Sequence, residues 1–181
     1  ARLCSPEVGQ PTFNRLLTRL YQRLLWNVVN AEFPRTQASI PSRMNEGNDE
    51  GVYRGEIIDP ETRVVTVDVA RAGMVPSNVC FEQLTDLLEP RAVRQDHLFM
   101  SRQTDEQGNV TGAKLSGEKV GESVEGSIVL FPDPMGATGY SLSQALDFYR
   151  RQVGGEADKL VTMNAIVTPE FVRRISEEVD P

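Results

Sequence analysis

Apolar residues recur three and four positions apart in four stretches of the chain, and this spacing lines up one face of an α-helix. In the first stretch the intervening arginines fall on the opposite side and are expected to form a solvated face. Ser77 stands where it can cap the second helix. In the last helix we expect Phe171, Val172 and Ile175 to face inward. The predicted helices are Pro11–Val29, Asn78–Leu88, Leu142–Val153 and Pro169–Val179.

Between the helical stretches lie short runs of apolar and β-branched residues that predict strands. The run at 127–131 does not alternate between apolar and polar positions, which favours a strand buried on both faces, as in a parallel sheet. Pro132 and Pro134 are expected to stop this strand, since neither can donate to a ladder. The other predicted strands are Tyr53–Ile58, Val64–Val69, Ala92–Met100 and Leu160–Val167.

The alternation of strands and helices predicts an α/β fold with a mainly parallel sheet flanked by helices and right-handed crossovers. At 181 residues the chain fits one domain. Within it we distinguish an N-terminal helix and arm (1–50) from an α/β core (51–181). Phe33–Asp49 is interpreted as a loop or arm, Gln107–Asn109 as a hairpin turn and Ser116–Glu125 as a connecting loop.

Composition and charge narrow the possible functions. Apolar residues make up 39% and charged residues 25% of the chain, as in ordinary soluble globular proteins. The net charge of −7 argues against broad electrostatic binding to nucleic acid. No apolar run approaches the roughly 20 residues that span a membrane. Cys4 and Cys80 are too far apart to suggest a disulfide framework or a metal site, so we expect Cys80 in the core and a reduced, cytoplasmic setting.

The candidate chemistry is concentrated in Gly126–Leu146, where a strand leads through an acidic residue and a Gly/Thr/Ser loop into a helix. Asp133 comes first, and Thr138 and Ser141 follow among two glycines. Free backbone amides and the dipole at a helix N-terminus favour an anion, while a nearby carboxylate suits a ribose diol or hydrated Mg²⁺. Taken alone, the loop fits an ordinary strand–helix turn with a serine cap better than it fits a ligand site. Acid and loop together favour a ribose-phosphate site, although the loop is neither a Walker loop nor a GxGxxG fingerprint.

The segment DPMGATGYS, residues 133–141, resembles the DPMxATGGS signature of uracil phosphoribosyltransferases, whose loop binds 5-phosphoribosyl 1-diphosphate (PRPP). It departs from the signature at Tyr140, where the family usually has a second glycine. The resemblance implies a catalytic role for Asp133, which would hold the ribose hydroxyls or stabilise a ribosyl cation. The residues that it implies for binding the 5′-phosphate are Ala137, Thr138, Gly139, Tyr140 and Ser141.

Two further segments resemble the pyrophosphate half of the family's site. Arg71, Ala72 and Gly73 match the Arg-Ala-Gly loop that follows a core strand and contacts pyrophosphate. From the residues alone, a plain surface arginine in a turn fits Arg71 at least as well. Arg102 is followed by threonine and acidic residues, as in the family's mobile hairpin, where the arginine also reaches the pyrophosphate.

Two polar residues on the predicted strands have no evident place in this site. His97 is the only histidine, and as a general base it would need a partner that the sequence does not show. We therefore interpret it as a structural histidine on a strand. Asp68 replaces the usual apolar residue before the Arg-Ala-Gly loop, and the sequence suggests no role for it.

The resemblance implies the type I phosphoribosyltransferase fold with a flexible β-hairpin, and transfer of ribose 5-phosphate from PRPP to uracil to give UMP and pyrophosphate. Mg²⁺ would accompany PRPP and be held mainly by it, and the expected assembly is a homodimer. The Gly/Asp-rich segment through which the family selects uracil is not in this sequence. The alternative function is therefore a non-catalytic PRPP- or nucleotide-binding regulatory or structural module. A purine-specific enzyme is disfavoured, because those usually carry two adjacent acids where this chain has Asp133-Pro134.

Overall fold

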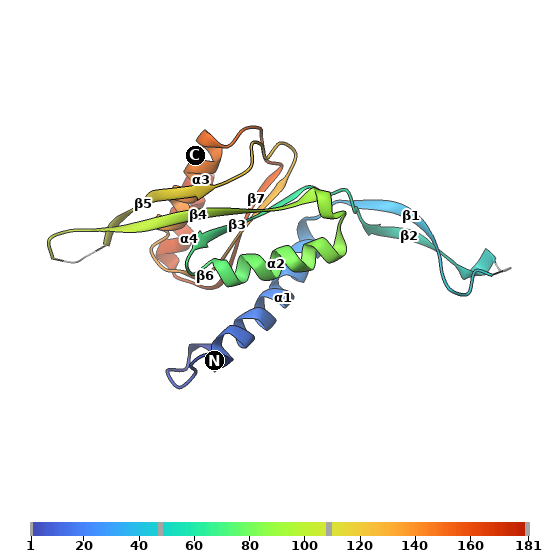
Figure 1. The fold of residues 1–181 in the computed structure, drawn as a ribbon, viewed down its shortest axis with the longest axis horizontal. Coiled ribbons are helices and arrows are strands. Elements are labelled where there is room, and N and C mark those ends of the chain that lie inside the picture. Colours follow the sequence, from blue (N-terminus) through green and yellow to red (C-terminus); the bar gives the residue numbers. More distant parts are fainter. Residues whose placement is uncertain (1, 47–48, 108–109, 180–181) are drawn as a thin grey trace.

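A computed structural model describes residues 2–46, 49–107 and 110–179 of the chain. Strands and helices alternate through most of this length (Figure 1). The helices are α1 (Thr12–Glu32), α2 (Met74–Leu87), α3 (Tyr140–Gln152) and α4 (Pro169–Val179); the strands are β1 (Arg35–Pro41), β2 (Val52–Ile58), β3 (Val64–Ala70), β4 (Val93–Thr104), β5 (Val110–Lys119), β6 (Ile128–Gly136) and β7 (Lys159–Val167).

Five strands form the main sheet in the order β5-β4-β3-β6-β7. Strands β3, β4, β6 and β7 run parallel, and β5 returns antiparallel to β4. This confirms the expected α/β fold with a mainly parallel sheet. From β3 the chain crosses to β4 on one side, whereas β6 pairs with β3 on the other side. The carboxyl ends of β3 and β6 therefore mark the point where the strand order reverses, and ligands of open α/β sheets bind at such a point.

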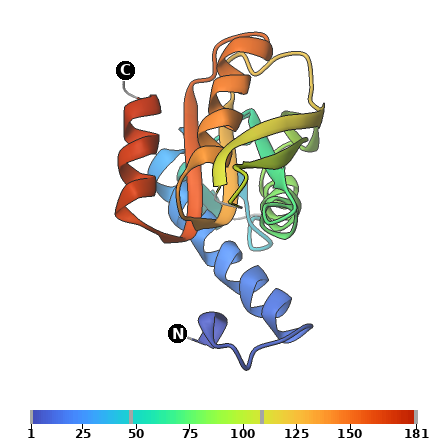
Figure 2. The ribbon, with the colours of Figure 1, turned by 90° about the vertical axis from the view of Figure 1, so that its left-hand side faces the viewer.

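Helices cover both faces of the sheet because the buried strands are apolar on both sides. Along β3, Val65, Val67 and Val69 pack with α3 and α4, whereas Val64 packs with α1 and α2. Figure 2 shows α2 (green) and α4 (red) on opposite sides of the molecule. None of the helices in the described residues has the length and apolar character needed to cross a membrane.

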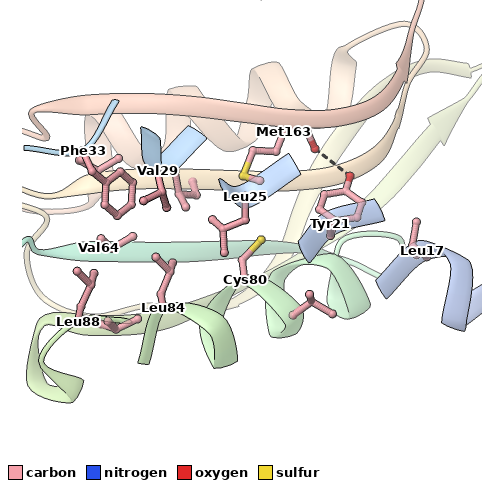
Figure 3. Close-up of a cluster of buried hydrophobic side chains, with 14 residues drawn as sticks. Leu17, Tyr21, Leu25, Val29, Phe33, Val64, Cys80, Leu84, Leu88 and Met163 are labelled. Carbon is pink, nitrogen blue, oxygen red and sulfur yellow. Dashed lines mark hydrogen bonds between the residues drawn. The ribbon is translucent and has the colours of Figure 1, made fainter. Parts of the chain in front are cut away.

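The core on the α1 side joins α1 and α2 to the sheet (Figure 3). Cys80 is fully buried there, as expected, and burial raises the pKa of its thiol to about 12. Tyr21 is also fully buried, and its hydroxyl donates a hydrogen bond of 2.9 Å to the backbone oxygen of Met163 in β7. This bond ties the long first helix to the strand beside β6.

The core on the α3 side contains a buried carboxylate that is fully engaged in hydrogen bonds. Asp96 is 1% exposed and accepts hydrogen bonds from the Arg94 guanidinium, the Tyr149 hydroxyl (2.6 Å) and the Gly121 amide. Burial, with the hydrogen bond to Asp96, raises the pKa of Tyr149 above its ordinary value. These partners provide what a buried charge needs, so the cluster links α3 to β4 rather than forming an open site.

Strand β6 continues past both prolines to Gly136, so the expectation that Pro132 and Pro134 stop it is wrong. β6 pairs with β3 only over Ile128–Leu130, but its pairing with β7 extends from Ile128 to Gly136. Pro132 and Pro134 are two residues apart on the strand, so their backbone nitrogens and carbonyl oxygens face the same side of it. The carbonyl oxygen of Pro132 lies beside Gly73, on the β3 side, where pairing has already ended. The missing proline donors therefore do not interrupt the ladder to β7.

The chain between α1 and β3 contains a strand that the sequence pattern did not predict. Residues Arg35–Pro41 of the expected loop or arm form β1, which pairs antiparallel with β2. The resulting hairpin projects away from the main sheet (Figure 1). Most of β1 is exposed, so it lacks the alternation of buried apolar residues that identifies a strand in a sequence.

Three other local expectations were also wrong. Helix α2 begins at Met74, not after Ser77. Ser77 does not cap the helix, because its buried hydroxyl accepts a hydrogen bond from the Gln95 side-chain amide. Pro76 is tolerated in the first helical turn because no backbone donor is needed there. Ser116–Lys119 belong to β5, not to a connecting loop, and their polarity suits an exposed edge strand. In α4, Val172 is 50% exposed, although Phe171 and Ile175 are buried as expected.

Candidate functional site

A cleft of about 980 Å³ lies at the carboxyl ends of β3 and β6, where the strand order reverses. The segments that follow these two strands form most of its wall, and Met100 and Gly112 of the β4–β5 hairpin contribute from one side. Eight of the ten residues proposed from the sequence line the cleft: Arg71, Ala72, Asp133, Ala137, Thr138, Gly139, Tyr140 and Ser141. Sequence positions up to 70 residues apart are brought together because parallel strands end at the same edge of the sheet.

The loop between β6 and α3 is fastened from behind by the β7–α4 segment. The oxygen of Gly136 accepts from the backbone amide of Thr168 (2.9 Å), and that of Ala137 accepts from the Thr168 hydroxyl (2.5 Å). The oxygen of Thr138 accepts from Nε of Arg174 in α4 (2.5 Å). Three consecutive carbonyl groups are thus held on the α4 side of the loop.

This arrangement turns backbone donors toward the cleft. In a trans peptide the carbonyl and the following N–H point in opposite directions. The amides of residues 137–139 therefore point away from α4, and these residues line the cleft. Gly139 has φ +80° and immediately precedes α3, so the first amides and the positive dipole end of that helix lie beside the loop. Geometry and dipole together suit a phosphate group.

Asp133 lies within β6 rather than in a turn after it, and its side chain lines the cleft. Its Oδ1 accepts a hydrogen bond from the backbone amide of Met135 (3.0 Å), and its backbone oxygen accepts one from the Asn164 amide (2.8 Å). Burial raises the pKa of the Asp133 carboxyl, and the hydrogen bond from Met135 opposes this effect in part. It is the only carboxylate among the described residues that line the cleft.

The three residues of the Arg-Ala-Gly loop take different positions at the end of β3. Arg71 and Ala72 line the cleft and are exposed, and Arg71 is the only cation among the described lining residues. Gly73 does not line the cleft. A Cβ atom at Gly73 would lie 2.8 Å from the backbone nitrogen of Val69 and 3.1 Å from the carbonyl oxygen of Pro132. Gly73 therefore permits the close turn that carries Arg71 to the cleft.

Arg102 lies in β4, opposite Ala113 of β5. The position of its side chain, and residues 108–109 of the expected hairpin turn, fall outside the described part of the structure. The strands on either side of that turn form the antiparallel hairpin that the sequence led us to expect. The role of Arg102 stays a prediction.

His97 has a partner that the sequence did not reveal. Its Nδ1 forms a hydrogen bond with Oδ2 of Asp68, which is 2% exposed. The two residues are paired in register on β3 and β4, and neither is among the lining residues of the cleft. Asp68 therefore supports His97 on the sheet, and the structural interpretation of this histidine fits its position.

Sequence reasoning missed several residues of the site. Asn164 and Phe171 line the cleft, while Thr168 and Arg174 hold the loop from behind. Phe171 also packs so closely on Gly136 that a Cβ there would lie 2.7 Å from its ring. None of these residues belongs to a motif. The only sequence signal was that the strand–loop–helix unit containing them follows the candidate loop directly.

The residues present fit a magnesium ion that arrives with its ligand. Within the described parts of the chain, no cluster of three or more His, Cys, Asp or Glu side chains is arranged for a metal ion. The single carboxylate of Asp133 faces the cleft, and Mg²⁺ commonly binds through one or two carboxylates together with substrate phosphates and water. Most of the ligands of such an ion would therefore come from the bound molecule.

Comparison with known proteins shows the family. The family model described as uracil phosphoribosyltransferase matches residues 2–181. The chain belongs to the uracil phosphoribosyltransferase family. A uracil phosphoribosyltransferase of Nicotiana tabacum is 27% identical over 169 residues, covering 93% of this chain and 68% of the tobacco protein. The match confirms the resemblance drawn from DPMGATGYS and places the chain in a family of transferases.

Solved structures confirm the fold. The AQ2163 protein from Aquifex aeolicus superposes with a TM-score of 0.72 at 20% sequence identity, covering 98% of this chain and 74% of that one. A hypoxanthine phosphoribosyltransferase from Staphylococcus aureus gives a TM-score of 0.55 at 11% identity, covering 86% of this chain and 65% of that one. The fold is therefore that of the type I phosphoribosyltransferases.

Proposed function

We propose that this protein transfers ribose 5-phosphate from PRPP to uracil, with UMP and pyrophosphate as products. The observation that carries the proposal is the convergence of Asp133, the 137–141 loop and Arg71 on one cleft at the reversal of strand order. A phosphate site, a carboxylate and a cation are the groups that a phosphorylated ribose with a diphosphate at C1 requires. The family to which the chain belongs supports uracil as the acceptor.

The 5′-phosphate is assigned to the loop between β6 and α3. The amides of residues 137–139 and the N-terminus of α3 supply donors, and the Thr138 and Ser141 side chains add hydroxyl groups on residues that line the cleft. These donors are fixed before the ligand arrives, because the loop carbonyls are already bonded to Thr168 and Arg174. Preorganised donors bind an anion without the cost of ordering the loop.

Asp133 is assigned to the ribose. Its ionised carboxylate would accept hydrogen bonds from the ribose hydroxyls and stabilise positive charge that develops on the sugar ring when the bond at C1 breaks. Burial disfavours the ionised form, so an approaching cationic sugar or Mg²⁺ would interact with a carboxylate that water screens poorly. Asp133 acts here as an electrostatic stabiliser, and the reaction requires no covalent intermediate.

The pyrophosphate is assigned to Arg71 and Arg102. The C1–O bond breaks with its electron pair on the departing pyrophosphate oxygen, N1 of uracil bonds to C1, and the N1 proton is released. Arg71 reaches the cleft from the end of β3, so its guanidinium would neutralise the charge that accumulates on the leaving group. Bound Mg²⁺ would add to this neutralisation.

Calorimetric titration with PRPP and Mg²⁺ tests the phosphate site. The wild-type chain is expected to bind with micromolar affinity, and a Thr138→Ala, Ser141→Ala double variant is expected to lose this binding. Gln144→Ala provides the control on the same helix, because Gln144 is a polar residue exposed on α3 and is not among the lining residues. Equal affinity of the double variant and the control would refute the assignment of the loop, and no binding at millimolar PRPP would refute the enzyme function.

Product analysis then tests the base. UMP formation from PRPP and uracil, with no IMP formed from hypoxanthine, is the expected result. Binding of PRPP without transfer to either base would favour the non-catalytic module. Size-exclusion chromatography with light scattering tests the homodimer that we also infer for this protein.

A further inference from the structure

Arg174 of α4 makes three contacts, two of them with the loop between β6 and α3 and one within its own helix. Its Nε donates to the Thr138 carbonyl oxygen, and its guanidinium carbon lies 3.9 Å from the centroid of the Tyr140 ring. A second nitrogen lies 3.4 Å from a carboxylate oxygen of Glu170, one turn earlier on α4. The Arg174 side chain is only 29% exposed. It is thus a restrained side chain rather than a mobile surface arginine.

The local chain is shaped to accept this arginine. Gly139 has no side chain, and a Cβ atom there would lie 3.1 Å from Cδ of Arg174. The aliphatic part of Arg174 therefore passes over Gly139 and brings its planar group onto Tyr140. A guanidinium is well suited to this position because it can stack on an aromatic ring and donate in its own plane at the same time.

We propose that Arg174 and Tyr140 form a lock that holds the Thr138–Gly139 peptide with its N–H toward the cleft, and so prepares the loop for the 5′-phosphate of PRPP. Both are positioning residues in this respect. The expected effect of this lock on the affinity for PRPP rests on the proposed function. The lock itself involves only contacts within the protein.

The lock acts through geometry rather than through the charge of the arginine. Arg174 is not among the lining residues of the cleft, and the carboxylate of Glu170 offsets its charge. The bond from Nε orients one loop carbonyl, and the ring holds the guanidinium in place. Removing either partner should release the same peptide, so the two substitutions should not have independent effects.

The titration with PRPP and Mg²⁺ is repeated on single and double variants. Arg174→Ala is expected to weaken PRPP binding on the order of 10-fold, the effect of one charge-assisted hydrogen bond. Arg173→Ala is the matched control: it removes the same charge from the next position of α4, where the side chain is exposed. Tyr140→Leu removes the aromatic ring on which the guanidinium lies and should therefore weaken binding. Adding Tyr140→Leu to Arg174→Ala should cost little more, since coupled residues are not additive.

Arg174→Lys separates geometry from charge. A lysine keeps the charge but cannot stack and donate as a planar fork, so it is expected to restore only part of the affinity. Full recovery by lysine would overturn the proposal, as would additive effects of the two substitutions or equal effects of Arg174→Ala and Arg173→Ala. Thermal unfolding of each variant shows whether a loss of affinity merely follows a loss of folding.

A measurement without ligand distinguishes failure of the lock from failure of the proposed function. In the free protein the Nε–H of Arg174 should exchange with solvent more slowly in NMR spectra than that of Arg173, and Tyr140→Leu should remove this protection. Protection combined with no PRPP binding by the wild type would uphold the lock and refute only its consequence. Rapid exchange in the wild type would refute the lock itself.

Discussion

The hydrogen bond between Tyr21 and Met163 offers a sharp test of how α1 is joined to the sheet. Tyr21 is fully buried, and its hydroxyl reaches the backbone of a strand 142 residues later in the chain. Met163 immediately precedes Asn164, which lines the cleft. Tyr21→Phe removes one oxygen atom and leaves the ring and its packing unchanged (Figure 3).

The expected cost follows from this geometry. An intramolecular hydrogen bond contributes about 1 kcal/mol net, because unfolding exchanges it for bonds to water. For a domain of this size, that free energy corresponds to a fall in Tm of roughly 2–4 °C. Tyr21→Ala should cost about 3–5 kcal/mol, since it also leaves a cavity in the core.

Urea denaturation followed by fluorescence and circular dichroism measures both effects. Tyr53→Phe is the matched control, because Tyr53 also donates to a backbone oxygen, that of Glu56 (2.9 Å), but is 50% exposed in the β1–β2 hairpin. The control should stay within about 0.5 kcal/mol of the wild type. If Tyr21→Phe unfolds at the same urea concentration as Tyr53→Phe, the hydroxyl does not join α1 to β7 energetically and the reasoning fails.

Two further predictions concern residues of β6. Burial raises the pKa of Asp133, so ionisation of this carboxyl lowers the stability of the folded state as the pH rises from about 4, the pKa in the unfolded chain, through the folded pKa. Asp133→Asn should therefore unfold at a higher urea concentration than the wild type at pH 7.5, and the difference should vanish at pH 3.5. An equal difference at both pH values would contradict this prediction. Gly136→Ala places a Cβ atom 2.7 Å from the ring of Phe171 and should lower the free energy of unfolding by about 1–3 kcal/mol. Gly9→Ala is the control, because no atom lies within 4 Å of a Cβ at that position. In the same urea denaturation experiment, Gly9→Ala should show no loss of unfolding free energy from steric overlap.

The strongest sequence signals were those that repeat over many residues. Helical spacing predicted α1, α3 and α4 almost to their ends, and β-branched runs predicted β3 and β7, because buried faces demand apolar residues at regular intervals. The segment DPMGATGYS was recognisable because most of its residues match the family signature in type and in order. Exposed strands such as β1 carried no such signal. The prolines of β6 misled because their effect depends on which side of the strand lacks a partner.

The amino-acid sequence was enough to predict the class of fold, the family and the residues of the loop that follows β6. The tertiary structure alone decided which distant residues support that loop. Thr168 and Arg174 follow it by some 30 residues, and their contacts arise only because β7 pairs with β6 and α4 returns over the loop. Asp68 and His97 likewise became partners only through the register of β3 and β4. Such contacts depend on strand order and register, which the whole fold sets and no local pattern encodes.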